Sequence, residues 1–157
     1  MPYKTLLFFC PLFFFISCKS EAQKRSTFKI QKSDAEWKME LTDLEYYVMR
    51  KEGTEPAFSS PLDKNYSSGT YVCKGCESPL FLSSHKFNSG SGWPSFDREI
   101  KGNVAFSVDY KMGIARTEEQ CASCGAHLGH VFNDGPKKTT GKRHCINGIA
   151  LKFIPKK

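Results

Sequence analysis

The sequence lacks any apolar run long enough to cross a membrane. A spanning helix needs about 20 apolar residues, whereas the longest run, residues 6–16 (LLFFCPLFFFI), has eleven and is interrupted by Pro11. Internal repeats are also lacking, apart from one short cysteine motif that occurs twice. With 39% hydrophobic, 13% aromatic and 25% charged residues, the chain of 157 residues is neither wholly disordered nor a bundle of membrane helices. Its length fits one ordinary domain with a short appendage.

The first seventeen residues are typical of an export signal, although no Ala-x-Ala cleavage site follows them. Lys4 supplies positive charge before the apolar run, and residues 15–18 (FISC) resemble a bacterial lipobox, in which the cysteine is lipid-modified and becomes the first residue of the mature chain. We therefore predict a lipoprotein signal at 1–17 and a lipid on Cys18. The protein is then exported and anchored in a membrane of the bacterial envelope, on its periplasmic or surface face. An ordinary signal that is cleaved nearby is the alternative.

Residues 18–32 are predicted to form a basic tether between that anchor and the domain. From residue 19 they read KSEAQKRSTFKIQK, with five basic residues, one acidic residue and little with which to build a core. The chain has a net charge of +7, from 23 Lys+Arg and 16 Asp+Glu, but the tether holds +4 of it and residues 33–157 only +2. The positive charge therefore favours an anionic membrane surface over nucleic acid as its partner.

Residues 33–157 are predicted to form a mainly β domain with short helices at its front. Two capping boxes, residues 33–36 (SDAE) and 42–45 (TDLE), predict one or two short helices between Asp34 and Lys51, with Gly53 as terminator. The side chains expected to face inward are Trp37, Leu41, Leu44, Tyr47 and Val48. Runs of β-type residues separated by Gly, Pro, Asn and Asp predict the strands of a small antiparallel sheet at 70–73, 80–82, 104–108, 113–117, 128–132 and 148–153.

Two Cys-x-x-Cys pairs, residues 73–76 (CKGC) and 121–124 (CASC), predict a structural metal site. Two such turns can complete a tetrahedron of thiolates around one zinc ion, and four protein ligands leave zinc no open position for a substrate. Gly75 and Gly125 suit the backbone bends that these turns need. The expected ligands are Cys73, Cys76, Cys121 and Cys124.

Two other arrangements of these residues remain open. An exported protein usually meets an oxidising compartment, in which the four cysteines could pair as disulfides. Alternatively, Cys121 and Cys124 could bind a metal together with His127 and His130, but that set would leave the first cysteine pair without a role.

One thiol is left for chemistry once the four ligands, the cysteine in the signal and the lipidated cysteine are set aside. It is Cys145, which follows Arg143 and His144 in a polar, turn-rich segment (GKRHCIN) that leads into an apolar strand. A neighbouring cation lowers the pKa of a thiol and raises its thiolate fraction. Cys145 is therefore the candidate nucleophile, and a buried free cysteine is the alternative interpretation.

From about residue 33 to residue 153 the sequence resembles the methionine-R-sulfoxide reductases, the B-type family. The matching stretches occur in family order and cover nearly the whole domain; they are SSPLDKNYSSGTYVCKGCESPLF, KFNSGSGWPSF, CASCGAHLGHVFNDGP and GKRHCIN. The resemblance implies the antiparallel β fold of that family with its structural zinc ion. It also implies reduction of methionine R-sulfoxide, free or in oxidised proteins, at the expense of a thioredoxin-like protein or another thiol.

The resemblance implies roles for residues in the last third of the chain. Cys145 stands where the family has its nucleophile, whose thiolate attacks the sulfoxide sulfur and becomes a sulfenic acid. His127 and His130 match the active-site histidines, which would protonate or hydrogen-bond the departing oxygen. Arg143 is expected to stabilise the thiolate, and Asn147 to form hydrogen bonds beside it.

The segment SGSGWPSF contains both a match and a departure from the family. Trp93 matches the tryptophan whose ring receives the substrate methyl group. Many members have a cysteine at the position of Ser91, which resolves the sulfenic acid as an internal disulfide, and a hydroxyl cannot perform this exchange. We therefore expect a one-cysteine cycle, in which an external thiol reduces the oxidised Cys145 directly. Gly148, where the family usually has serine, is expected to alter local packing and leave the chemistry intact.

Two functions without catalysis compete with this interpretation. One is a zinc-ribbon binding module, and the other is a zinc-stabilised structural lipoprotein. A nucleic-acid partner is not expected, because the protein is predicted to be exported and lacks basic and aromatic residues interleaved along one strand. Both alternatives predict that Cys145→Ser is silent, whereas the enzyme requires this thiol.

Overall fold

The computed structural model describes Met1 and residues 28–157. Residues 2–27 lie outside the described residues. They include the predicted signal after Met1, the predicted lipidation site Cys18 and the predicted tether as far as residue 27. The helices are α1 (Asp34–Glu40) and α2 (Asp43–Lys51), and the 3₁₀ turns are η1 (Pro61–Lys64), η2 (Ser83–His85) and η3 (Gly148–Ala150). The strands are β1 (Gly69–Cys73), β2 (Pro79–Leu82), β3 (Lys86–Phe87), β4 (Ser95–Phe96), β5 (Val104–Asp109), β6 (Arg116–Cys121), β7 (His127–Phe132), β8 (Arg143–Ile146) and β9 (Leu151–Pro155).

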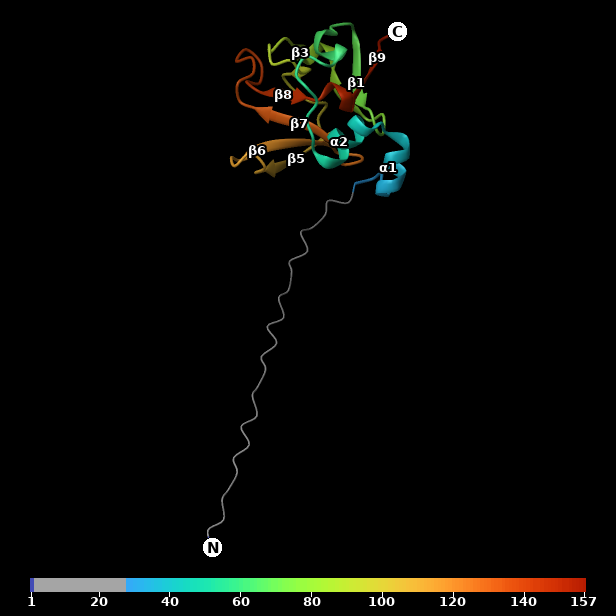
Figure 1. Cartoon of the computed structure of the whole chain (residues 1–157). Helices are drawn as coiled ribbons and strands as arrows, with labels where there is room; N and C mark the ends of the chain where they lie inside the picture. The colour runs from blue at the N-terminus through green and yellow to red at the C-terminus, as the bar shows by residue number, and fades with distance from the viewer. Residues whose placement is uncertain (2–27) are drawn as a thin grey trace.

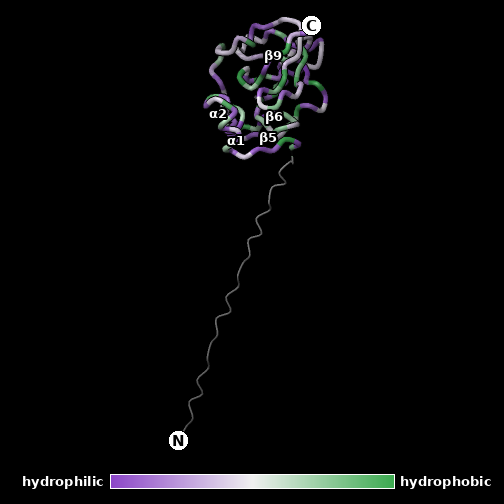
Figure 2. Tube along the Cα trace, turned by 90° about the vertical axis from the view of Figure 1, so that its right-hand side faces the viewer, coloured by the Kyte–Doolittle hydropathy of each residue, from purple (hydrophilic) through white to green (hydrophobic). Residues whose placement is uncertain are grey.

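These strands build two antiparallel sheets, which confirms the predicted mainly β fold with short helices at its front. The smaller sheet has the order β2-β1-β9, and the larger has the order β3-β4-β8-β7-β6-β5. In both views α1, β5 and β6 lie at one end of the domain and β9 at the other (Figure 1 and Figure 2). No helix among the described residues is long and apolar enough to cross a membrane.

Both predicted capping boxes are present and start the two helices. The backbone N–H of Ser33 donates to the carboxylate of Glu36 at 2.7 Å, and that of Thr42 donates to Glu45 at 2.8 Å. Each cap side chain accepts a hydrogen bond from the glutamate N–H in return. Reciprocal caps of this kind stabilise a short helix by satisfying N–H groups that have no partner within it.

The prediction of the inward face holds for α1 and only in part for α2. Trp37 and Val48 are buried as expected, but Leu44 is 43% exposed and Tyr47 is 53% exposed. Tyr46 and Met49 face the core instead. The chain leaves the helical conformation at Leu41 and Thr42 before α2 begins. This break resets the angular register, so one face cannot be extrapolated through both helices.

The helical segment ends at Lys51, as predicted, but the residue that terminates it is Glu52 and not Gly53. Glu52 adopts the left-handed conformation at φ 56°, whereas Gly53 does not. The N–H of Gly53 donates to the carbonyl of Tyr47 at 3.1 Å. A Cβ on Gly53 would lie 2.2 Å from the Tyr47 ring, so glycine is needed there for close approach and not for a positive φ.

Two strand predictions differ from the structure, and three further strands were not predicted. The expected strand at 113–117 begins later, as β6, and the expected strand at 148–153 begins with η3 before β9. β6 has the sequence RTEEQC, and its two adjacent glutamates are buried because each pairs with a histidine. A polar buried strand of this kind carries no apolar alternation to reveal it. β8, which contains Cys145, and the two-residue strands β3 and β4 are additional.

An aromatic cluster joins the two sheets at the centre of the core. Phe81 of β2 stacks on Phe96 of β4 with ring centroids 4.4 Å apart, and Tyr71 of β1 meets Phe96 edge-on at 5.0 Å. All three side chains are fully buried, and burying one side chain of this size stabilises the fold by about 1.5–3 kcal/mol. The sheets therefore pack as one unit around this cluster.

The local packing at Gly148 supports a prediction about stability. A Cβ at this position would lie 2.1 Å from the Ser60 hydroxyl oxygen and 2.4 Å from Ser60 Cβ. Gly148→Ser should therefore lower the free energy of unfolding by about 1–3 kcal/mol through overpacking. Ser60→Gly removes only a cap of η1 and should cost a few tenths of a kcal/mol.

The double variant tests whether these two positions interact. Because Ser60→Gly removes the atoms that a side chain at position 148 would strike, the combined loss should be smaller than the sum of the two single losses. Urea unfolding of the four proteins, followed by circular dichroism, measures this coupling. Additive losses would contradict the proposed contact.

Candidate active site

Cys145 lies in the middle of the larger sheet, on β8 between β4 and β7. It pairs with Ser95 on one side and with His130 on the other. The thiol is partly buried and opens into a pocket of about 150 Å³. The lining residues come from five parts of the chain; they are Thr54, Trp93, Arg116, Gly129, His130, Phe132, Cys145 and Asn147. The structure thus brings together four of the six predicted catalytic and substrate-binding residues around one hollow.

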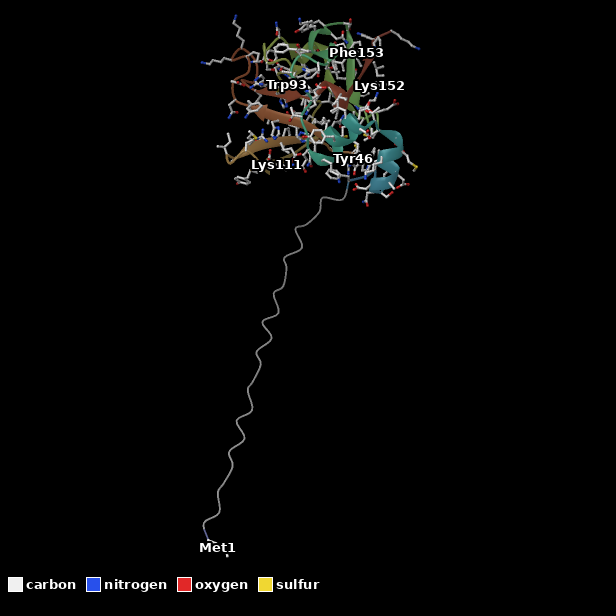
Figure 3. All side chains as sticks on the ribbon, viewed as in Figure 1. Met1, Tyr46, Trp93, Lys111, Lys152 and Phe153 are labelled. Carbon is white, nitrogen blue, oxygen red and sulfur yellow. The ribbon has the colours of Figure 1, made fainter. Side chains whose placement is uncertain are left out.

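Aromatic rings form the apolar part of this pocket. The indole N–H of Trp93 donates to the backbone carbonyl of Glu55 at 3.2 Å, which fixes the ring and satisfies its polar atom. Phe132 supplies a second ring beside it. Figure 3 places Trp93 on the side of the domain that also carries β8. A small apolar group next to the thiol would therefore contact aromatic surface.

The two histidines are held by carboxylates, and only one of them lines the pocket. His130 donates through Nε2 to Asp109 at 2.8 Å, and burial lowers its pKa despite this partner. His127 is buried behind it, with the ring centroids 5.4 Å apart, and its Nδ1 pairs with Glu118 at 2.6 Å. Nε2 of His127 is buried without a hydrogen-bond partner among the described residues.

Both carboxylates that hold these histidines were missed at the sequence level. Burial opposes ionisation of Glu118, but hydrogen bonds from His127 and Ser107 hold its pKa below the ordinary value. The pKa of Asp109 is also lowered, first by the backbone N–H of Lys111 and then by side-chain partners. Both groups therefore stay ionised and orient the imidazoles. Asp109 ends β5, and Glu118 lies in the polar strand β6. No sequence pattern marks either carboxylate as the partner of a histidine.

Arg143 reaches the thiol but is shared with an acidic partner. Its guanidinium donates to both oxygens of Asp134, at 2.8 and 2.9 Å, and lies 4.5 Å above the ring of Phe132. Burial raises the pKa of Cys145, and the Ser91 hydroxyl and the Arg143 charge counteract this only in part. The expectation of a lowered thiol pKa is therefore wrong for the free protein, because desolvation outweighs the cation.

His144 is not the second cation beside the thiol. It points to the opposite face of β8, where Nδ1 pairs with Glu119 at 2.6 Å and Nε2 lies 3.5 Å from Glu99. Successive side chains of a strand alternate between its faces, so a residue adjacent to Cys145 in sequence cannot share its pocket.

Asn147 and Glu55 form a buried polar junction behind the pocket. The Asn147 amide donates to the carbonyl of Leu128 at 3.0 Å, and its oxygen accepts the backbone N–H of Glu55 at 3.0 Å. The Glu55 carboxylate accepts the N–H groups of Gly148 and Ile149. Glu55, which is 3% exposed, therefore supports both Asn147 and Trp93, although nothing in its sequence context indicates burial.

Ser91 lies beside the candidate nucleophile. Its hydroxyl oxygen is 3.8 Å from Cys145 Sγ and 2.8 Å from the hydroxyl of Ser89, which in turn is 2.7 Å from that of Ser95. The serine that stands where the resemblance leads one to expect a resolving cysteine is thus within contact distance of the thiol.

The four cysteines of the Cys-x-x-Cys pairs form a separate, buried cluster. All four sulfur atoms lie within 4.8 Å of one another, and two of the pairs are 3.5 Å (Cys76–Cys121) and 3.7 Å (Cys73–Cys124) apart. A disulfide requires about 2.0 Å, whereas two thiolates on a tetrahedral zinc ion with bonds of about 2.3 Å lie about 3.8 Å apart. The geometry fits a metal ion, and the histidines of the mixed Cys/His alternative face their carboxylates instead.

The two cysteine turns have the same backbone geometry. The N–H of Glu77 donates to Cys73 and that of Gly125 to Cys121, both at 2.8 Å. Glu77 and Gly125 have φ of 58° and 70°. The left-handed residue of the first turn is therefore Glu77, whereas the sequence predicts Gly75. Gly75 instead allows close packing, because a Cβ there would lie 3.0 Å from Met49.

The segment that begins at Phe28 packs on the second cysteine turn. The N–H of Ile30 donates to the carbonyl of Ser123 at 2.8 Å, and the ring of Phe28 lies against Gly125. Residues 28–32, which were assigned to the tether, therefore contact the folded domain.

Comparison with known proteins agrees with this geometry. The family model of the SelR domain matches residues 41–155. The chain is 52% identical over 127 residues to the peptide methionine sulfoxide reductase MsrB of Leptospira interrogans, covering 80% of this chain and 96% of that protein. It is 48% identical over 128 residues to the protein of the same name from Agrobacterium fabrum, covering 81% and 94%. A non-catalytic binding or structural module is not favoured. The chain belongs to the SelR-domain family of MsrB peptide methionine sulfoxide reductases, and its chemistry is the reduction of methionine sulfoxide.

Proposed function

We propose that the protein reduces the R epimer of methionine sulfoxide, in oxidised proteins or free, by attack of Cys145 on the sulfoxide sulfur. The observation that carries this proposal is the pocket in which Cys145, Trp93 and His130 converge. The methyl group of the substrate would lie on the indole ring, and the oxygen would point towards the histidines. One epimer alone can satisfy both contacts while it presents its sulfur to the thiol.

The first half-reaction converts a thiol and a sulfoxide into a sulfenic acid and a thioether. The Cys145 sulfur bonds to the sulfoxide sulfur, and the oxygen receives a proton from the histidine side. The bond between the oxygen and the methionine sulfur then breaks, the oxygen bonds to the Cys145 sulfur, and the S–S bond breaks to release methionine. His130 is the proton donor nearest the pocket, and His127 supports it from behind. Arg143 stabilises the thiolate as it forms, which matters because burial raises the pKa of the free thiol.

The second half-reaction requires a reductant from outside the protein. Among the described residues the other cysteines all belong to the buried cluster, and the Ser91 hydroxyl lies 3.8 Å from the thiol. We therefore propose a one-cysteine cycle, in which a thioredoxin-like protein or another thiol reduces the sulfenic acid directly.

The catalytic cycle is tested by single-turnover experiments on the full chain. With excess N-acetylmethionine R-sulfoxide and no reductant, we expect one equivalent of thioether per chain and a sulfenic acid on Cys145 that dimedone traps. The S epimer should give no product, and Cys145→Ser should give none with either epimer. Chromatography and mass spectrometry measure both products. Lack of turnover of the R epimer with every thiol donor would refute the activity.

Ser91→Cys supplies the matched test of the missing resolving thiol. The variant places a sulfur close to Cys145, so a disulfide between position 91 and Cys145 should replace the trapped sulfenic acid. Ser89→Cys, whose hydroxyl is one step further along the chain of serines, should still give the sulfenic acid. A stoichiometric internal disulfide of Cys145 in the unaltered protein would contradict the one-cysteine cycle.

We further propose that the cysteine cluster binds one structural zinc ion. Its donor set and spacing suit zinc, and its burial away from the pocket gives the ion no route to the substrate. Elemental analysis should find one zinc per chain, and Cys124→Ser should lose the metal and unfold at a much lower temperature. Cys145→Ser should retain both metal and stability. Full stability of Cys124→Ser would exclude a structural metal.

Finally, we propose that the protein is exported and anchored in the bacterial envelope by a lipid on Cys18. Support comes from the sequence, in which a short apolar run precedes the lipobox-like residues 15–18, followed by a basic segment. In a bacterial host, Cys18→Ser should move the protein from the membrane fraction to a soluble one, whereas Cys10→Ser should not. Membrane association that survives Cys18→Ser would contradict lipidation at this residue.

A further inference from the structure

A second hollow is lined by Ser91, whose hydroxyl lies beside the Cys145 thiol. It is a cleft of about 460 Å³, and it shares no lining residue with that pocket. The two hollows are thus separate openings in the surface. The residues that line the cleft are Phe87, Asn88, Ser89, Gly90, Ser91, Asp134, Gly135, Pro136 and Arg143.

Two of these lining residues contact the nucleophile. The Ser91 hydroxyl oxygen lies 3.8 Å from Cys145 Sγ, and the Arg143 charge is close enough to act on the same thiol. A group that enters the cleft and moves the Ser91 hydroxyl aside would therefore contact Cys145 Sγ. Cys145 itself lines only the pocket, so a reactant in the cleft reaches the sulfur past the Ser91 hydroxyl.

The chemical character of the cleft differs from that of the pocket. The pocket has Trp93 and Phe132 in its wall, whereas the cleft is bordered by the hydroxyls of Ser89 and Ser91 and by the ion pair of Arg143 with Asp134. Residues 134–143 (DGPKKTTGKR) form one rim of the cleft and contain four basic residues and one acidic residue. This rim attracts anions. The wall of the cleft offers hydrogen-bonding groups together with the apolar side chains of Phe87 and Pro136.

We propose that this cleft binds the reductant of the second half-reaction, and that its occupant is a small thiol carrying a carboxylate group. The inference rests on the one-cysteine cycle proposed above. The volume lies in the range of sites for small molecules, and the basic rim complements a carboxylate. A thiol bound there is directed at Sγ past Ser91, so reduction does not require the thioether product to leave the sulfoxide pocket first.

The chemistry in the cleft balances with two molecules of thiol. The sulfur of the first thiol bonds to Cys145 Sγ, the S–O bond of the sulfenic acid breaks, and the oxygen leaves as water with the thiol proton. The sulfur of the second thiol then bonds to the first thiol, and the mixed disulfide breaks to return Cys145 as a thiol. The sulfenic acid is reduced by two electrons, and two thiols are oxidised to one disulfide.

The test separates the two half-reactions in the full chain. The sulfenic acid is first formed with one equivalent of N-acetylmethionine R-sulfoxide, and its reduction is then timed with 2-mercaptoacetate or 2-mercaptoethanol. These thiols are similar in size and differ in charge. Their intrinsic reactivities cancel when the ratio of their two rate constants is compared between variants.

Removing charge from the rim should change that ratio. Lys137→Gln combined with Lys138→Gln should lower the ratio of the mercaptoacetate to the mercaptoethanol rate constant about fivefold at low ionic strength, as expected for two charges near the bound carboxylate. The matched control is Lys156→Gln combined with Lys157→Gln, which removes the same charge at the end of β9 and should leave the ratio unchanged. Formation of the sulfenic acid should be unaffected in both.

A substitution that fills the cleft with a larger side chain is the second test of the proposal. Asn88 is exposed and lines the cleft, so Asn88→Tyr should slow reduction by both small thiols about tenfold or more, whereas Asn88→Ser should not. Unchanged rates in Asn88→Tyr, or an unchanged ratio in the lysine variant, would overturn the proposal. Slowing of a thioredoxin-like protein without slowing of the small thiols would also overturn it. Failure to form the sulfenic acid in the unaltered chain would instead remove the proposed function itself.

Discussion

The meeting of the two cysteine turns is the constraint on which the rest of the structure depends. Cys73 ends β1 of the smaller sheet and Cys121 ends β6 of the larger one, so the cluster ties the two sheets at a single point. The helices also attach there, because Arg50 donates to the carbonyl of Cys124 at 3.2 Å and Gly75 packs under Met49. Four thiols gathered in a buried place are costly to leave without a partner, which makes a bound cation the natural solution.

The side chains of the pocket are held in place by carboxylates, each of which has a hydrogen-bond partner. Glu118 and Asp109 hold the two histidines, and Glu55 holds the turn after Cys145 together with Asn147. A buried carboxylate is stable only when hydrogen bonds or charges replace its lost hydration. These pairs therefore restrict the rotation of the side chains that line the pocket. The carboxylates lie in β5, in β6 and in the segment between α2 and η1.

The parts of this molecule that could be predicted are those that depend on local sequence. The capping boxes, the paired cysteines and the remaining thiol all involve residues within a few positions of one another. The predictions that failed depend on tertiary environment. Leu44 and Tyr47 turned outward because a break between the helices changes their register, and the pKa of Cys145 is raised because burial outweighs Arg143. Glu55 could not be found, since only the fold brings it beneath Trp93 and Asn147.

The hydroxyl of Ser91 beside the thiol has a consequence for the lifetime of the oxidised enzyme. A neighbouring sulfur would convert a sulfenic acid into a disulfide within the same molecule, which protects it from further oxidation. Beside a serine, the sulfenic acid persists until a reductant arrives, and a second encounter with peroxide would carry it irreversibly to the sulfinic acid. The partial burial of Cys145 then acts as protection, because it limits the access of oxidant during that interval. Survival of such an enzyme under oxidative stress depends on the supply of thiol as much as on its own turnover.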